Sequence, residues 1–282
     1  MRTCPEPRRR GRGLLPDPFK DPLLRLRRTN DIPYFTFNAM DRCPGIVHGV
    51  FTRLGGSSKG PFTALNVGMN SGDDPGAVSM NRQAVANCLG QGELFFLSQV
   101  HGTGIAEPGN ANAAGGDPPE ADAVISDTPG RMLVVQVADC QSVMLYDPDT
   151  PAVANIHAGW RGSIGNIIGR CIDAMKDRFG TRPESLVATI GPSLGPCCAE
   201  FVNHENEIPR QFLPYKDDRN RFNFWQVSHD QLTACGVFGQ HIEWSNICTR
   251  CNTHLFFSYR HEKTTGRFAS VIGLPPPDAE RK

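Results

Sequence analysis

Three residues of this sequence have side chains that commonly bind transition metals. His101, Cys140 and His157 each lie at the end of a predicted strand, next to a glycine or an acidic residue. Two imidazoles and one thiolate suit zinc, and three protein ligands leave a fourth position for water or substrate. The residue types therefore indicate a catalytic zinc site rather than a structural one.

Other interpretations of the same residues stay open at this stage, because separations of 39 and 17 residues match no short ligand motif. Cys140 could be the nucleophile of a cysteine hydrolase or amidase, with His157 or His101 as its base. The residues could also be buried or hydrogen-bonded groups at turns, or belong to a non-catalytic binding module. A multicopper oxidase needs many closely spaced imidazoles, whereas this chain has eight histidines and no H-x-H.

Apolar runs and turn residues predict the elements that position these three side chains. Strands are expected at residues 46–51, 95–100, 122–125, 132–137, 143–146, 152–156, 186–190, 255–259 and 268–272, and helices at 74–90, 164–179 and 228–235. The helix over 164–179 repeats apolar residues every three or four positions and ends at Gly180, a typical C-terminal cap. Its N-terminal region follows His157 and carries Arg161, so it favours anions.

Composition restricts the class of protein. With 282 residues, 39% of them apolar and 21% charged, the chain suits one large or two small globular domains. A formal net charge of zero gives no global electrostatic case for nucleic-acid or membrane binding. No apolar run approaches the roughly 18 residues of a transmembrane helix. Ten cysteines without a framework pattern favour reduced thiols and a cytoplasmic location.

Four of the cysteines occur as two close pairs in the sequence. Cys248 and Cys251 form a C-x-x-C, and Cys197 and Cys198 are adjacent. A structural zinc site normally takes four ligands in paired spacing, and the second C-x-x-C is missing. These four residues are therefore expected to be structural or non-ligating thiols.

The chain is expected to fold as one domain over residues 31–274. Residues 1–30 are rich in arginine, proline and glycine and predict a disordered basic arm, and the polar residues 275–282 predict a disordered tail. Within the domain, a Gly/Ser-rich loop at 52–60 carries Arg53 and could hold an anion through its backbone N–H groups, although it lacks P-loop spacing. Asn66 follows this loop.

A series of short motifs resembles the YfiH/laccase-domain family, long called multicopper polyphenol oxidases and now regarded as purine nucleoside phosphorylases. The resemblance covers about residues 31–274. The motifs, in order, are HGVFTRLGG at 48–56, LNVG at 65–68, QVHG at 99–102, ADC at 138–140, HAGWRG at 157–162, IGP at 190–192 with CC at 197–198, FFSYR at 256–260 and TGR at 265–267.

The resemblance implies a single-domain αββα sandwich of the α+β class, with zinc rather than copper held by His101, Cys140 and His157. It implies phosphorolysis of adenosine, inosine and methylthioadenosine, so that a purine nucleoside and phosphate are the expected partners, and adenosine deamination is also attributed to the family. The sequence departs from the family pattern at Ser193, where a cysteine is usual, and at His261, where arginine is frequent. Both departures could alter the rim of the pocket.

Chemistry suggests roles for four further residues. Phosphorolysis needs an anion site beside the ribose C1′ and stabilisation of the departing purine. Arg53 and Arg161 are candidates for binding phosphate, with Arg161 also a catalytic candidate. Asp139, next to a proposed ligand, could act as an acid or base or as support for the site. Asn66 is a candidate for substrate binding. The sequence does not indicate an oligomeric state.

Overall fold

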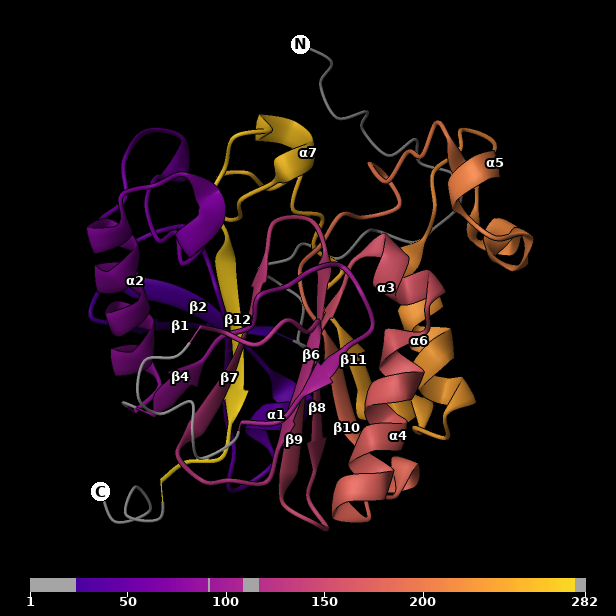
Figure 1. The fold of residues 1–282 in the computed structure, drawn as a ribbon, viewed down its shortest axis with the longest axis horizontal. Helices are drawn as coiled ribbons and strands as arrows, with labels where there is room; N and C mark the ends of the chain where they lie inside the picture. Colours follow the sequence, from indigo (N-terminus) through magenta and orange to yellow (C-terminus); the bar gives the residue numbers. More distant parts are fainter. Residues whose placement is uncertain (1–23, 91, 109–116, 277–282) are drawn as a thin grey trace.

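The computed structural model of this protein describes residues 24–90, 92–108 and 117–276. The predicted arm therefore lies outside the described residues as far as residue 23, as does the predicted tail from residue 277. Within the described ranges the chain forms two six-stranded sheets that pack face to face (Figure 1). This arrangement confirms the predicted α+β class.

The central pairs of both sheets are antiparallel. The first sheet has a parallel pair at one edge, β4 with β7, and the second has a parallel pair at each edge, β10 with β11 and β5 with β6. The order of the first sheet is β1 (Leu24–Thr29), β2 (Ile32–Phe37), β3 (Val47–Phe51), β12 (Phe268–Gly273), β7 (Arg131–Val137) and β4 (Glu93–Phe95). The order of the second is β11 (Ile242–Trp244), β10 (Val187–Ile190), β8 (Gln141–Asp147), β9 (Ala152–Ala158), β6 (Ala123–Ser126) and β5 (Ile105–Ala106).

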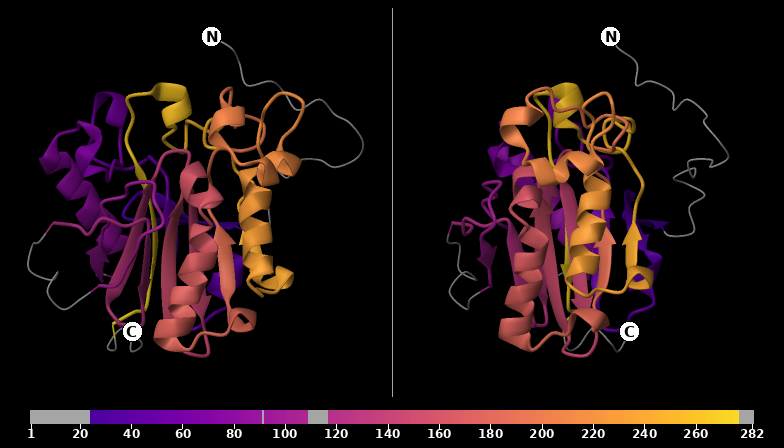
Figure 2. Two further views of the ribbon diagram at one scale, coloured as in Figure 1. Left: turned by 45° about the vertical axis from the view of Figure 1, so that its right-hand side comes forward. Right: turned by 90° about the vertical axis from the view of Figure 1, so that its right-hand side faces the viewer.

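Helices cover the outer face of each sheet and complete the four layers of the predicted αββα sandwich. Helix α2 (Pro75–Cys88) packs on the first sheet. Helices α4 (Ile167–Phe179) and α6 (Phe224–Ala234) pack on the second, as Figure 2 shows, with the short α3 (Trp160–Ile164) at their upper end. Shorter helical turns are α1 (Asn38–Asp41), α5 (His204–Glu207), α7 (Tyr259–Glu262), η1 (Gly60–Phe62), η2 (Met69–Ser71), η4 (Pro183–Ser185), η5 (Arg210–Tyr215) and η6 (Gly239–His241).

Strand alternation builds the layers, because successive side chains point to opposite faces of a sheet. On β7, Leu133 and Val135 enter the core between the sheets, whereas Met132 and Val134 pack toward α2. Strands β8 and β9 alternate in the same way between the inter-sheet core and α4. Both faces of these central strands are buried, which explains their nearly continuous apolar sequences.

The predicted helix over 164–179 is confirmed in its main part but is interrupted at its start. Asn166 adopts a left-handed conformation (φ 55°), and its side-chain oxygen accepts a hydrogen bond from the Gly169 N–H at 3.3 Å. This cap ends α3 and begins α4 in a new direction. Gly180 closes α4 with φ 72°, as its position predicts.

Two predicted strands are wrong in extent or type. The strand at 95–100 ends at Phe95, because the Gln99 side chain takes over the pairing and exchanges two hydrogen bonds with the backbone of Gln136. The strand at 255–259 is a turn leading into α7. There Phe256 and Phe257 are buried in the inter-sheet core without joining a ladder.

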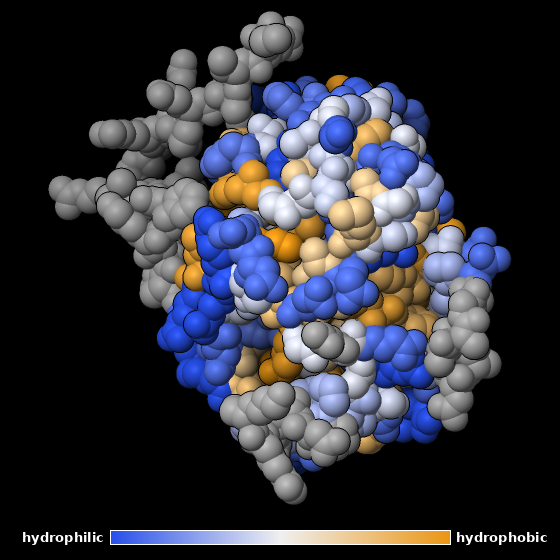
Figure 3. Space-filling view, turned by 90° about the vertical axis from the view of Figure 1, so that its left-hand side faces the viewer, coloured by the Kyte–Doolittle hydropathy of each residue, from blue (hydrophilic) through white to orange (hydrophobic). Residues whose placement is uncertain are grey.

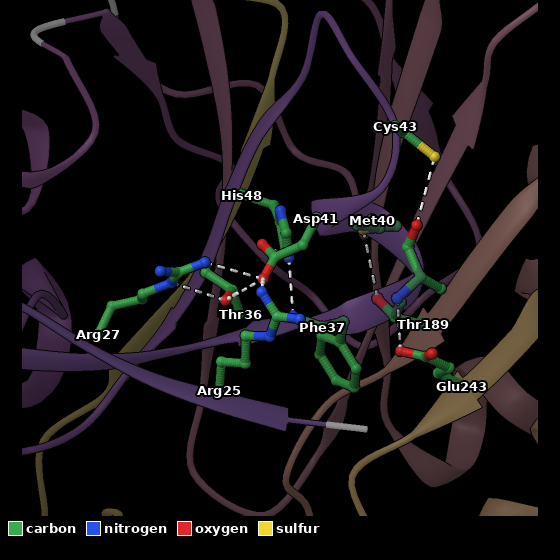
Figure 4. Close-up of polar contacts among 11 residues, drawn as sticks. Arg25, Arg27, Thr36, Phe37, Met40, Asp41, Cys43, His48, Thr189 and Glu243 are labelled. Atoms are coloured by element: carbon green, nitrogen blue, oxygen red, sulfur yellow. Dashed lines mark hydrogen bonds and ion pairs between the residues drawn. The ribbon is translucent and has the colours of Figure 1, made fainter. Parts of the chain in front are cut away.

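The predicted boundary of the basic arm is also wrong, because residues 24–29 form β1 and pair with β2 along their whole length. Arg27 donates to Asp41 at 3.1 Å, so part of the basic composition serves an ion pair (Figure 4).

Nearby, His48 Nε2 accepts from the Phe37 N–H at 2.8 Å, and burial lowers the pKa of His48 to about 4 despite the Asp41 carboxylate. His48 is therefore a neutral core residue at neutral pH.

The outer surface is mixed in polarity. On the face beside α2, apolar areas lie among polar ones (Figure 3). Of the helices in the described ranges, none is both long and apolar enough to cross a membrane.

One buried amide links the two sheets. Asn155 on β9 is fully buried, and its Nδ2 donates to the carbonyls of Leu133 and Ser270 in the opposite sheet, each at 2.9 Å.

Asn155→Ala would leave both carbonyls without these bonds, so we expect the free energy of unfolding to fall by about 1–3 kcal/mol. Urea denaturation measures this loss. Asn206→Ala, at an exposed position of α5, is the control and should change stability by less than about 0.5 kcal/mol; equal effects would contradict the inter-sheet role.

Candidate active site

The three predicted metal ligands meet at one end of the sandwich. Their donor atoms all lie within 4.8 Å of one another, with His101 Nε2 3.9 Å from Cys140 Sγ. His157 is the penultimate residue of β9 and shares the inter-sheet face with Asn155. Cys140 directly precedes β8, whose first residue pairs with the last residue of β9. His101 comes from the loop after β4 and has a left-handed backbone (φ 61°).

A buried carboxylate organises this cluster. Asp122 Oδ1 accepts hydrogen bonds from His157 Nδ1 at 2.7 Å and from the His101 N–H at 2.9 Å, and its Oδ2 accepts from the Gly102 N–H at 2.6 Å. Burial alone would raise the pKa of Asp122, but these hydrogen bonds outweigh it and hold the pKa below its usual range. With Nδ1 donating to the carboxylate, Nε2 is the atom of His157 left to bind a metal.

Close approach of the ligands requires a glycine between them. A Cβ at Gly159 would lie 3.1 Å from His101 Cδ2 and 3.2 Å from Cys140 Sγ. These contacts are tighter than side-chain carbons normally make, so a larger residue would push the imidazole and the sulfur apart. The glycine of the HAGWRG segment thus has a direct steric role in the site.

The environment of Cys140 favours its thiolate. Burial would raise the pKa of this thiol, but the adjacent His157 and His101 outweigh burial and lower the pKa to about 6. The thiolate is the form that binds metals and also the form that attacks electrophiles. The donor set of two imidazoles and one thiolate, held by Asp122 and spaced by Gly159, fits a zinc ion.

A cavity of about 1120 Å³ opens over the cluster and is lined by four arginines, Arg82, Arg161, Arg260 and Arg267. Arg161 is exposed, and its guanidinium lies 4.6 Å from the centre of the Trp160 ring. Arg82 stacks on Phe96 at 3.7 Å, and burial lowers its pKa to about 10, so it stays charged at neutral pH. The cavity therefore combines a metal-type donor set with positive charge suited to an anion.

Asp139 lines the same cavity, but its carboxylate is engaged with the chain. It accepts hydrogen bonds from Thr249 Oγ1 at 2.6 Å, Ser258 Oγ at 2.7 Å and the Arg260 N–H at 2.6 Å. Its backbone is left-handed (φ 93°), a conformation that costs energy outside glycine. These contacts tie Asp139 to the segments around the cavity, and both a supporting role and an acid/base role in the site stay predictions.

Arg53 and Asn66 do not reach the lining of the cavity. Arg53 donates to Glu262 Oε1 at 2.8 Å and stacks on Phe257 at 4.4 Å. Asn66 is fully buried, and its Oδ1 accepts from the N–H groups of Gly68 and Arg267, both of which line the cavity. Asn66 therefore positions parts of the cavity wall, and direct contact of either residue with a substrate stays a prediction.

Of the two departures from the family pattern, Ser193 is fully buried and its Oγ accepts from Trp225 Nε1 at 2.7 Å. His261 lies on α7. Neither residue lines the cavity.

Sequence reasoning missed Asp122, Arg82 and Arg267 as site residues. Asp122 precedes a short strand with no motif around it, and only the fold shows that its carboxylate faces His157. Arg82 lies on the cavity side of α2. It is inside a helix, whereas the predicted site residues were chosen at strand ends and in the neighbouring loops. Arg267 is the last residue of the TGR motif, and this motif offered the one available signal.

The fold and the site define an α+β sandwich protein with a two-histidine, one-cysteine metal-type centre. A family model described as "Multi-copper polyphenol oxidoreductase laccase" matches residues 47–275. The chain belongs to this YfiH/laccase-domain family.

Named relatives and solved structures agree with this assignment. "Purine nucleoside phosphorylase YlmD" of Geobacillus stearothermophilus is 33% identical over 247 residues, covering 81% of this chain and 90% of its own. "Purine nucleoside phosphorylase YfiH" of Escherichia coli K12 is 33% identical over 236 residues, covering 79% and 91%. The crystal structure of YlmD from Geobacillus stearothermophilus superposes with a TM-score of 0.80 at 29% identity, covering 90% and 99%.

The position of Asp122 predicts that it controls metal affinity. Asp122→Asn removes the charge that favours the Nδ1–H form of His157 and presents an amide N–H₂ to backbone donors. We expect zinc at this site to bind about 10–100-fold more weakly. Competition with a chromophoric chelator measures the affinity, and exposed Asp127→Asn is the charge-matched control. Unchanged affinity in Asp122→Asn would show that the carboxylate does not support the metal.

Proposed function

We propose that this protein is a zinc-dependent purine nucleoside phosphorylase acting on adenosine, inosine and methylthioadenosine. The observation that carries the proposal is the convergence of His101, Cys140 and His157 in the lining of a cavity that also contains four arginines of the described residues. The names of the relatives support the same reaction class. The soft thiolate and two imidazoles support zinc as the ion.

The proposed reaction uses the positive charge of the cavity, because one of its substrates is phosphate. A phosphate oxygen forms a bond to the ribose C1′ while the bond from C1′ to the purine nitrogen breaks, and the purine leaves with the bonding electrons. Guanidinium groups bind phosphate oxygens through paired hydrogen bonds, which makes the arginines that line the cavity, Arg161 and Arg267 among them, candidates for orienting phosphate. A zinc ion held by the three ligands would supply Lewis acidity.

Aromatic side chains of the cavity would bind the purine. Trp160, Phe201 and Tyr259 line it, with the Trp160 and Phe201 rings 6.0 Å apart and steeply inclined. Purine rings stack on such side chains and lose contact with water. Arg260 also lies over the Phe201 ring at 5.5 Å, which adds positive charge beside this surface.

A cysteine hydrolase remains the second candidate because of one observation: the Cys140 sulfur lies beside the imidazoles of His101 and His157, which lower the pKa of its thiol. In that mechanism the thiolate attacks a carbonyl and the imidazole transfers the proton. The two proposals differ in what Cys140 does. If Cys140 is a metal ligand, its substitution releases the metal. If Cys140 is a nucleophile, its substitution leaves the metal bound.

The proposal predicts phosphate-dependent release of hypoxanthine from inosine. His101→Ala and Cys140→Ala should each lower the zinc content by one ion per chain and abolish cleavage. Elemental analysis and chromatography of the same samples measure both quantities. Retained zinc with lost activity in Cys140→Ala would favour the hydrolase. Zinc-free wild-type protein whose activity is independent of phosphate would refute the phosphorylase. With adenosine, release of adenine marks phosphorolysis and release of inosine marks the proposed deaminase activity.

Placement in the cavity predicts that Arg161 and Arg53 differ in function. Arg161→Ala should raise the KM for phosphate about 10–100-fold, since a charge-assisted hydrogen bond contributes about 1.5–3 kcal/mol. Initial rates at varied phosphate measure the change. Arg53→Ala should lower stability through loss of the Glu262 ion pair and leave this KM within about twofold, as should the exposed control Arg178→Ala. A raised KM in Arg53→Ala alone would reassign the phosphate site to the 52–60 loop.

A further inference from the structure

Four cysteines outside the candidate active site meet in space. The sequence contains no second C-x-x-C, but the fold brings the adjacent pair Cys197 and Cys198 together with the C-x-x-C of Cys248 and Cys251. Strands β10 and β11 run parallel, and the chain continues this pairing through a bridge between Ser193 and Cys248. The two segments that follow these strands therefore lie side by side. Their sulfur atoms all lie within 4.8 Å of one another in a cluster of Cys197, Cys198, Cys248 and Cys251.

The spacing of the four sulfur atoms matches a tetrahedral metal site. Cys251 Sγ lies 3.6 Å from both Cys197 Sγ and Cys198 Sγ, and Cys248 Sγ lies within 4.8 Å of the other three. Zinc–sulfur bonds of about 2.3 Å in a tetrahedron place the sulfur atoms about 3.8 Å apart. A disulfide bond would need about 2.05 Å. Every pair of sulfur atoms lies within 4.8 Å, near the separation that four ligands around one ion require.

The surroundings of the cluster are those of a metal–thiolate centre. The Gly195 N–H donates to Cys248 Sγ at 3.3 Å, a contact that stabilises a thiolate. A Cβ at Gly195 would lie 3.0 Å from Cys248 Cβ, so this approach needs glycine. Cys198 and Cys248 are buried while Cys251 is exposed, which gives an ion a route to the site.

Two arginines offset the charge that such a centre carries. One zinc ion and four thiolates have a net charge of −2. Arg221 Nη1 donates to the Cys197 carbonyl and Arg260 Nη1 donates to the Cys198 carbonyl, each at 3.3 Å. Both guanidinium groups are therefore held beside the cluster by contacts to the ligand residues themselves.

We propose that a second, structural zinc ion is bound by four thiolates, those of Cys197, Cys198, Cys248 and Cys251. Four protein ligands fill the tetrahedron and leave no position for a substrate, so the ion stabilises the fold rather than reacting. On binding, each thiol gives up its proton to solvent and zinc takes the resulting thiolate. This inference is independent of the reaction proposed above.

The zinc ion would fix one wall of the active-site cavity. The Thr249 N–H donates to the Ser193 carbonyl at 3.0 Å, and Thr249 Oγ1 donates to Asp139, the neighbour of Cys140. The Leu194 N–H donates to the Asp139 carbonyl at 2.8 Å. Both cysteine-bearing segments are thereby joined to the strand end that carries the first metal site.

Metal stoichiometry tests the proposal on the full chain. Protein produced with zinc should contain two zinc ions per chain by elemental analysis. His101→Ala should retain one, the double variant Cys197→Ser/Cys251→Ser should retain one, and the three substitutions together should retain none. Cys88→Ser, on α2, is the matched control and should retain two. Cobalt added to metal-depleted His101→Ala should give the intense visible absorption of a tetrahedral tetrathiolate.

Several outcomes would overturn the tetrathiolate site. One is a single zinc ion in the wild type that is lost in His101→Ala and unaffected by the double variant. Another is a disulfide among the four cysteines in protein prepared without reductant, seen by mass spectrometry. If the double variant does not fold, alkylation of the wild type decides the question. The four cysteines should be protected from N-ethylmaleimide until a chelator is added, and labelling at the same rate without chelator would refute the proposal.

Discussion

The hydrogen bond between the buried Asp122 carboxylate and His157 is the interaction on which the site depends. The carboxylate also binds the backbone N–H groups of His101 and Gly102, so one group sets the tautomer of one histidine and the position of the loop that carries the other. A buried charge is costly unless it is hydrogen-bonded. The Asp122 carboxylate is stabilised by its hydrogen bonds to His157 and to the N–H groups of His101 and Gly102. The metal-type centre is therefore coupled to the packing of β6 against β9.

The sandwich explains why chemistry is concentrated at one end. Strands β8 and β9 are buried on both faces, so they leave room for polar side chains mainly where they end. Cys140 and His157 lie at that end, and Gly159 allows His101 to approach them. The left-handed residues His101 and Asp139 flank the same point. Unfavourable backbone conformations are thus held in place by hydrogen bonds from several elements, a pattern typical of functional sites.

Two clusters of metal-type ligands lie on either side of Asp139. The carboxylate of Asp139 binds the segment that carries Cys248 and Cys251, while its backbone leads directly into Cys140. Arg260 joins the two regions, because its N–H contacts Asp139 and its guanidinium contacts the carbonyl of Cys198. The wall of the cavity and the cysteine cluster are accordingly one connected structure.

Local patterns in the sequence predict the central strands, helix α2, the main part of α4 with Gly180 at its C-terminus, and the three candidate metal ligands. These features depend on local periodicity and on residue types at strand ends, which are visible without a fold. Four features became visible only in the folded chain. They are the contacts of Asp122 with both histidine segments, the position of Arg53 outside the cavity lining, the presence of Arg82 and Arg267 in that lining, and the proximity of the four cysteines. Each of these depends on contacts between segments far apart in the chain, and no local pattern encodes such distances. The failed strand at 255–259 has the same cause, since burial of Phe256 and Phe257 needs the core rather than a ladder.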